Sequence, residues 1–216
     1  MTRHLVPTLA AALALAASAA TQAEEPLPSP PITHGNGKLL LTGGVSSIDG
    51  AAGGGLTPWA VTASYATANQ FGGTAHATRV VTQDYAMNAY GAALGISDRF
   101  ELSIAQQDFD TGPTGPALGL PGLHLKQDIV GLKWHFAGDA VLDSDSWMPQ
   151  LAIGLEHKRT DAGDLEPTLK ALGADLSGTD LYLSATKLFL ATGVLVNGTL
   201  RVTKANQNGL LGFGGT

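Results

Sequence analysis

Apolar and polar residues alternate with a period of two over long stretches in the second half of this chain. Between Val194 and Thr203 one face is almost wholly valine and leucine, whereas the other face is polar from Asn197 onward. A period of two is typical of a β-strand whose two faces meet different surroundings. The alternation outlasts the roughly five or six residues of an average strand and reaches the roughly nine to eleven that cross a membrane. It therefore predicts one strand of a transmembrane barrel.

The same pattern, bounded by glycine, proline and aspartate turns, predicts nine strands. We expect an all-β fold, specifically an antiparallel up-and-down transmembrane β-barrel. The first strand is Lys38 to Thr42, and the last two are joined by a short turn at Ala191 to Gly193. The other predicted strands are 59–66, 74–82, 85–96, 99–107, 125–136, 147–158, 179–190 and 194–204.

Small or polar residues on one parity and large apolar ones on the other suit a barrel with a polar lumen, but a soluble β-sandwich shows the same pattern. Connection lengths favour the barrel. Three connections on one side, 43–58, 108–124 and 159–178, are long, and those on the other side are shorter. Outer-membrane barrels have long outer loops and short periplasmic turns. The predicted lumen-lining residues are Lys133, His135, Gln150, Glu156, Lys158, Asp180, Asn197, Thr199 and Arg201.

If the long connections lie outside the cell and the short ones in the periplasm, the aromatic residues fall on the apolar face, near the periplasmic ends of their strands. Aromatic residues form belts at the lipid–water boundary of barrels, whereas a soluble core would scatter them along the strands. The predicted interface aromatics are Phe100, Trp134, Phe136, Trp147 and Phe189.

Residues 1–23 predict a secretory signal peptide. Arg3 and His4 precede an apolar run that is too short for a membrane-spanning helix, and small residues follow it. Residues 24–37 are proline-rich and predict an extended tail, which leaves 38–216 as the barrel domain. No other apolar run reaches about 20 residues, so the exported chain would enter a membrane only as a sheet. We expect it in the cell outer membrane, with outer-membrane lipid as its partner.

Composition excludes some classes of function. The chain has no cysteine, so no disulfide framework is expected, and a net charge of −6 without a basic cluster argues against a nucleic-acid partner. The glycine-rich stretch from Gly43 to Pro58 lacks the spacing of a phosphate-binding loop. We expect a flexible loop there, or a segment inserted into the pore.

No motif predicts a catalytic, cofactor or metal site. The histidines show no metal-ligand spacing, and His135 and His157 point to opposite faces of the sheet. Asp139, Asp143 and Asp145 predict a solvated acidic turn. Five strand residues could serve a barrel enzyme, but they form no recognisable constellation and we expect no enzyme. These five are Ser103, Ser184, His135, Glu101 and Glu156.

Three features disagree with a complete barrel. Lys187 falls on the lipid-facing parity, where its side chain would have to reach the interface. Pro149 falls inside a predicted strand, where it removes a ladder hydrogen bond. Bacterial barrels have even strand numbers, and the residues after Lys204 predict no further strand. We therefore expect a chain that is truncated from a barrel of ten or more strands.

Four stretches of this chain carry a family resemblance: LLLTGGVSSIDGAAGGGLTPWAV, ALGLPGLHLKQDIVGLKWHFAGDAV, PQLAIGLEHKR and GTDLYLSATKLFLATGVLVNGTLRVTKANQNGLLGFGG. They resemble the proteobacterial family DUF3034, a domain of unknown function, over essentially all of the mature chain. The resemblance implies an exported outer-membrane protein, usually longer than this chain. It supplies no catalytic or binding residues.

The expected function is that of an outer-membrane barrel, either a pore for small solutes or a structural envelope protein. The lumen-facing charges suit both. They would tune solute selectivity in an open pore, or pair across the interior of a closed barrel and carry no function. The alternatives are a secreted or periplasmic all-β binding module and, less favoured, a barrel enzyme acting on lipid.

Overall fold

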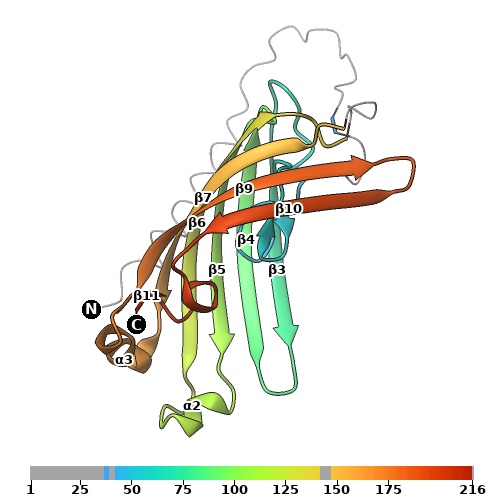
Figure 1. The fold of residues 1–216 in the computed structure, drawn as a ribbon. Coiled ribbons are helices and arrows are strands. Elements are labelled where there is room, and N and C mark those ends of the chain that lie inside the picture. The colour runs from blue at the N-terminus through green and yellow to red at the C-terminus, as the bar shows by residue number, and fades with distance from the viewer. Residues whose placement is uncertain (1–36, 39–41, 142–146, 216) are drawn as a thin grey trace, which may run out of the picture. The chain divides into compact units, whose positions relative to one another are not determined.

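One seven-stranded antiparallel sheet dominates the structure, a computed structural model that describes residues 37–38, 42–141 and 147–215 (Figure 1). The strand order is β10-β9-β7-β6-β5-β4-β3, so the long strands that follow one another in the chain also lie side by side. The predicted all-β, antiparallel, up-and-down fold is confirmed. The strands are β3 (Phe71–Val81), β4 (Ala86–Ile96), β5 (Phe100–Asp110), β6 (His124–Ala137), β7 (Gln150–Asp161), β9 (Ser177–Phe189) and β10 (Val194–Val202).

The sheet is curled and open. Among the described residues, β3 and β10 each have a sheet neighbour on one side only. No helix in the described ranges is long and apolar enough to cross a membrane. The short elements are β1 (Gly53–Gly54), β2 (Thr57–Pro58), β8 (Ala174–Asp175), β11 (Phe213–Gly214), the α-helices α2 (Thr114–Ala117) and α3 (Glu166–Ala171), and the 3-10 turns η1 (Gly163–Leu165) and η2 (Asn206–Gly209).

The two faces of the sheet carry different side chains. On one face, here called the polar face, Lys133 and Glu156 are buried. On the other, the apolar face, Leu132 and Leu183 are exposed. Register keeps the two sets apart, because residues that pair across strands lie on the same face. The sheet therefore buries polar side chains and exposes large apolar ones, the reverse of the usual distribution in a soluble domain.

Residues 43–66, here called the covering segment, lie against the polar face (Figure 1). The predicted strand at 59–66 is wrong, because this stretch joins no ladder of the sheet. Its small alanine and serine side chains allow it to approach the polar face closely. Some of its backbone groups bond to one another, and others bond to side chains of the sheet, as when Ala60 N donates to Thr186 Oγ1 at 2.8 Å.

Two strand boundaries differ from the prediction for simple reasons. β3 begins at Phe71, so Gly72 lies inside the strand and not in a turn before it. A Cβ at Gly72 would lie 2.5 Å from Ser64 Oγ, so close packing of the covering segment requires glycine there. β7 begins at Gln150, directly after Pro149, because proline has no N–H to donate to the ladder.

Several sequence predictions fall outside the described residues. These are the signal peptide (1–23), nearly all of the extended tail (24–37) and residues 39–41 of the predicted first strand.

An apolar cluster lies on the polar side of the sheet, at the end where α2 and α3 connect the strands. Leu123, Leu125 and Leu169 are buried in it. After Lys204 the chain folds onto this cluster through Leu210 and adjoining residues. That end of the polar face is therefore covered by apolar side chains.

We predict that glycine is required at position 154 of β7 but not at position 198 of β10. A Cβ at Gly154 would clash with the phenol of Tyr182 and lie 2.8 Å from the Leu132 carbonyl oxygen, whereas a Cβ at Gly198 meets nothing within 4 Å. Gly154→Ala should lower the free energy of unfolding by about 1–3 kcal/mol through overpacking. The matched control Gly198→Ala should change it by less than about 1 kcal/mol.

Denaturant unfolding of the two variants and of the parent chain measures this difference. Equal stability of both variants would show that the Tyr182 ring does not cover Gly154.

Candidate functional site

A buried ion pair, Glu101–Lys133, fixes the covering segment to the middle of the polar face. Lys133 Nζ lies 3.0 Å from Glu101 Oε1, and each side chain is 1% exposed. The Glu101 carboxylate accepts hydrogen bonds from Ala52 N (2.9 Å) and Ala63 N (2.8 Å). The Lys133 ammonium donates to the carbonyl oxygens of Ala52 (3.0 Å) and Val61 (3.2 Å). The pair thus holds peptide groups of a segment that joins no ladder of the seven-stranded sheet.

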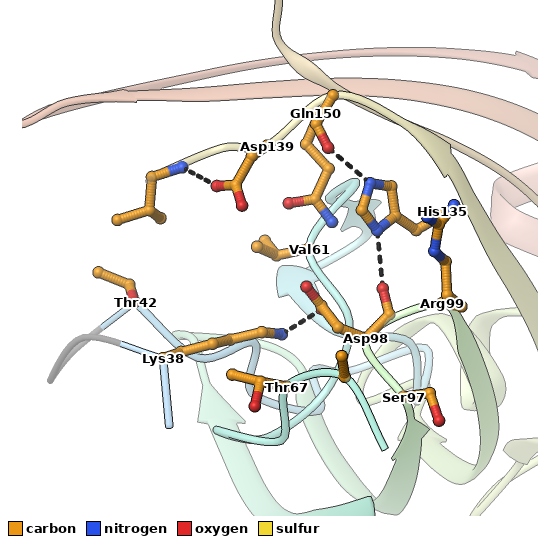
Figure 2. Close-up of a pocket in the computed structure, with 13 residues that line it drawn as sticks. Lys38, Thr42, Val61, Thr67, Ser97, Asp98, Arg99, His135, Asp139 and Gln150 are labelled. Atoms are coloured by element: carbon orange, nitrogen blue, oxygen red, sulfur yellow. Dashed lines mark hydrogen bonds and ion pairs between the residues drawn. The ribbon is translucent and has the colours of Figure 1, made fainter. Parts of the chain in front are cut away.

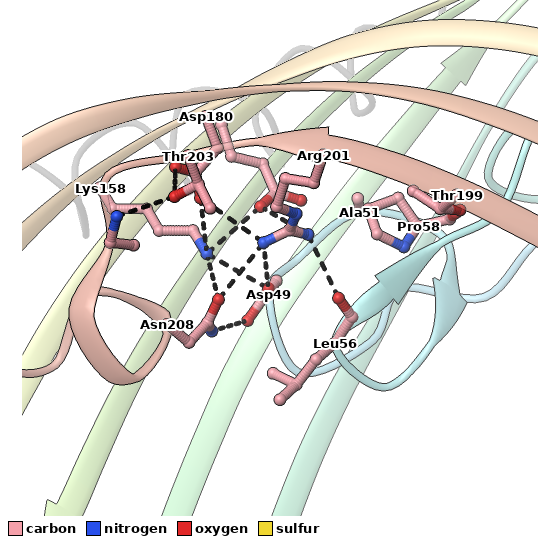
Figure 3. A network of polar contacts seen from close by, with 12 residues as sticks. Asp49, Ala51, Leu56, Pro58, Lys158, Asp180, Thr199, Arg201, Thr203 and Asn208 are labelled. Carbon is pink, nitrogen blue, oxygen red and sulfur yellow. Dashed lines mark hydrogen bonds and ion pairs between the residues drawn. The ribbon is translucent and has the colours of Figure 1, made fainter.

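Asp49 lies at the centre of a second buried network, which Figure 3 shows. Its Oδ1 accepts hydrogen bonds from Gln107 Nε2 (2.8 Å) and Asn208 Nδ2 (3.1 Å). Its Oδ2 lies 3.4 Å from Lys158 Nζ and 3.7 Å from Arg201 Nη1. The four partners come from β5, η2, β7 and β10, so this one carboxylate ties the covering segment to three strands and to the C-terminal turn.

Glu156 and Asp180 add two carboxylates to the same network. Arg201 Nη2 lies 3.3 Å from Glu156 Oε2, and Arg201 Nη1 lies 3.5 Å from Asp180 Oδ2. Lys158 Nζ lies 3.4 Å from an oxygen of each. Within the described residues, Glu156 Oε1 is buried without a hydrogen-bond partner. Each cation is therefore shared among several carboxylates.

At the opposite end of the polar face, Asp98 joins the start of the described chain to a cavity of about 360 Å³ (Figure 2). Lys38 Nζ lies 2.7 Å from Asp98 Oδ1 and donates to Thr62 Oγ1 at 2.8 Å. The ring nitrogens of His135 lie 2.7 Å from the Asp98 carbonyl oxygen and 2.8 Å from that of Gly138. The polar groups around this cavity are thus engaged with one another and with the backbone.

All nine predicted lumen-lining residues lie on the polar face, and their role in a pore stays a prediction. Besides Lys133, Lys158 and Arg201, two more of them hold the covering segment directly. Gln150 Nε2 donates to Ala60 O at 3.0 Å, and Thr199 Oγ1 donates to Pro58 O at 2.7 Å. Six of the nine are buried: Lys133, His135, Gln150, Glu156, Lys158 and Asp180. The other three, on the edge strand β10, are half-buried: Asn197, Thr199 and Arg201.

Four residues of these networks were not predicted as wall residues. Glu101 and Gln107 share the inward parity of β5 with Ser103, so the alternation in that strand could have identified them. Asp49 and Asn208 lie in irregular segments, where no period shows which side chain meets the sheet. No signal in the sequence marks these two.

The five predicted interface aromatics are exposed at the end of the sheet opposite α2 and α3. Phe100 pairs with Trp134 across β5 and β6. The ring centroids of Trp134 and Phe136 are 5.8 Å apart, and those of Trp147 and Phe189 are 6.0 Å apart. Together these rings form an aromatic row at that end of the apolar face.

Four of the side chains considered for catalysis have other partners. Ser184 Oγ donates to Pro58 O at 2.8 Å, and both ring nitrogens of His135 face carbonyl oxygens. Glu101 is held by Lys133, and Glu156 by Lys158 and Arg201. His135 lies on the polar face and His157 on the apolar face. No group of three potential metal ligands occurs in the part of the chain that the structure describes. Of the predicted acidic turn, Asp143 and Asp145 lie outside that part.

We predict that breaking the Glu101–Lys133 pair from one side destabilises the fold more than breaking it from both. Lys133→Met leaves a buried unpaired carboxylate and should lower the free energy of unfolding by about 3–5 kcal/mol. Glu101→Gln/Lys133→Met removes both charges, keeps an acceptor for the covering segment, and should recover part of that loss.

The control is Lys170→Met, which breaks the exposed pair of Lys170 with Glu166 and should change stability by less than about 1 kcal/mol. Denaturant unfolding of all four proteins provides the comparison. A double variant less stable than Lys133→Met would contradict the role of the unpaired charge.

Residues 42–216 match the family described as "Protein of unknown function (DUF3034)". No curated protein sequence and no solved structure matches the chain.

Proposed function

The chain belongs to the DUF3034 family, and from its geometry we propose that it is an outer-membrane β-barrel protein whose polar interior is filled by its own covering segment. In this proposal the protein is a structural component of the envelope and not an open pore. The observation that carries the proposal is the separation of side chains between the two faces of the sheet.

A continuous apolar band crosses the exposed face. Register aligns one residue from each of six neighbouring strands into a single row of five leucines and a valine. Such a surface is a liability in water and is what lipid requires of the outer face of a barrel. The row consists of Leu94, Leu102, Leu132, Leu155, Leu181 and Val202.

The band has an edge, as a membrane-spanning surface should. Toward α2 and α3 the same face turns polar, and Gln106, Asp128 and Arg159 occupy successive positions of one row. Along β9 the apolar positions run from Leu181 to Phe189, a rise of roughly 26 Å at about 3.3 Å per residue. This is of the same order as the roughly 25 Å apolar band of outer-membrane barrels.

The aromatic row lies at the other edge of this band, where Trp and Phe side chains suit a lipid–water boundary. Lys187, the one lysine within the band, is compatible with that position. Its Nζ reaches the carbonyl oxygens of Asp139 (3.2 Å) and Met148 (3.3 Å) in the connection at the same end. Lys187 is 6% exposed, so its ammonium group is held by these backbone carbonyl groups and not by water.

The state of the polar face favours a closed interior over an open pore. In a water-filled lumen the wall charges would be solvated, yet Glu101, Lys133 and Lys158 are at most 1% exposed. The covering segment takes the place of water along most of that wall. The pairing of opposite charges across the interior is the arrangement expected of a filled barrel.

We predict that the apolar face tolerates charge only if it faces water. Leu132→Arg places a cation in the middle of the band and should destabilise a membrane-embedded protein by about 2–4 kcal/mol. The control Leu118→Arg, directly after α2 and outside the sheet, should have little effect although Leu118 is also exposed (59%, against 42% for Leu132). Recovery from the outer-membrane fraction and heat-modifiable migration on gels are the measurements.

Equal tolerance of the two substitutions, with recovery as a soluble periplasmic protein, would exclude the proposal. That outcome would favour the secreted or periplasmic binding module instead.

We predict no stable channel current from the folded protein in planar bilayers, because the covering segment fills the polar face. A control protein of the same preparation, heated until its gel migration changes, defines the background. Steady conductance steps from the folded sample alone would show an open pore and contradict the filled interior.

A further inference from the structure

The carboxylate of Asp49 occupies a complete binding site. One oxygen meets two uncharged amide donors and the other meets two cationic groups: Gln107 and Asn208 on Oδ1, and Lys158 and Arg201 on Oδ2. The donors come from four different elements, and Asp49 itself is 1% exposed. This is the donor set that recognises a carboxylate, which presents two oxygens in one plane.

The wall part of this site does not depend on Asp49 for its charge balance. Lys158 and Arg201 also contact Glu156 and Asp180. Two cations and two carboxylates therefore remain together when Asp49 is removed. The cations stay in place because each is held by other acidic groups, so the site is preorganised for an incoming carboxylate.

Asp49 lies in a reverse turn that places its side chain in the site. Gly50 N donates to Ser47 O at 2.7 Å, and Gly50 has a φ of +94°, so the carboxylate projects from the tip of a reverse turn. Gln107 Nε2 also donates to Ile48 O at 3.1 Å. The occupant is thus a small appendage held by polar contacts, separate from the ladders that hold the sheet together.

We propose that Gln107, Lys158, Arg201 and Asn208 form a carboxylate-binding site on the polar face, which the chain's own Asp49 fills and which takes a small carboxylate when the Asp49 side chain is removed. The site is independent of the membrane location proposed above, because it rests on contacts within the polar face alone.

The test is chemical rescue of Asp49→Ala with formate, which replaces the group that the substitution removes. The full-length folded protein is melted in sodium formate and in sodium chloride of equal ionic strength, with near-UV circular dichroism as the signal. Asp49→Ala should melt below the parent chain in chloride. Formate should raise its Tm with a saturable dependence on concentration and recover a substantial part of the loss.

Two comparisons identify the site. The parent chain should show no formate-specific rise, because Asp49 already fills the position. Asp49→Ala/Arg201→Gln should lose the rescue, because one of the two cations is gone. Equal melting of Asp49→Ala in formate and chloride, or a rescue that persists without Arg201, would overturn the proposal.

If Asp49→Ala does not fold in chloride, Asp49→Ser is melted in the same way. Its hydroxyl retains one acceptor for Gln107 while leaving the cationic side of the site open. A formate-specific rise in Tm supports the site, and the same Tm in both salts overturns it. Either result is distinct from a failure of the membrane proposal, which is read from fractionation.

Discussion

The ion pair of Glu101 and Lys133 is the contact on which the covered polar face depends. Peptide groups removed from water must find partners, and those of the covering segment that do not pair within it must find them among side chains of the sheet. The carboxylate and the ammonium supply acceptors and donors from two adjacent strands to both arms of the segment. Each charge is in turn neutralised by the other. The pair therefore provides hydrogen-bond partners for buried peptide groups and a counter-charge for each buried ion.

Period-two alternation was sufficient to predict the sheet and the two faces of its strands. In β5 to β10 the large apolar residues of one face differ sharply from the small or polar residues of the other. It failed at 59–66, where small residues also alternate but the backbone bonds to Thr186 and Glu101 side chains. It could not identify Asp49 or Asn208, because both lie in irregular segments whose position depends on long-range contacts. The residues of the polar face could be predicted from the local pattern, whereas the segment that covers this face could not.

The charges on the polar face also help to fix the position of the covering segment. Buried ion pairs add little to stability when compared with apolar packing, but they are specific about geometry. Lys158 and Arg201 each contact several carboxylates, and Asn208 bonds to Asp49, Lys158 and Arg201 at once. More than half of the covering segment is glycine, alanine and serine, so this pattern of charges adds to the few apolar contacts, such as that of Val61, that position it.

The direction of the two edge strands restricts how the sheet can be closed. Every neighbouring pair in the seven-stranded sheet is antiparallel, so β3 and β10 run the same way. A second copy rotated about an axis along the strands would bring β10 of one molecule beside β3 of the other as a parallel pair. A seam that is antiparallel on both sides needs an odd number of additional strands between them. Because the sheet has seven strands, two copies related by an axis along the strands cannot form a fully antiparallel barrel by direct β10–β3 pairing.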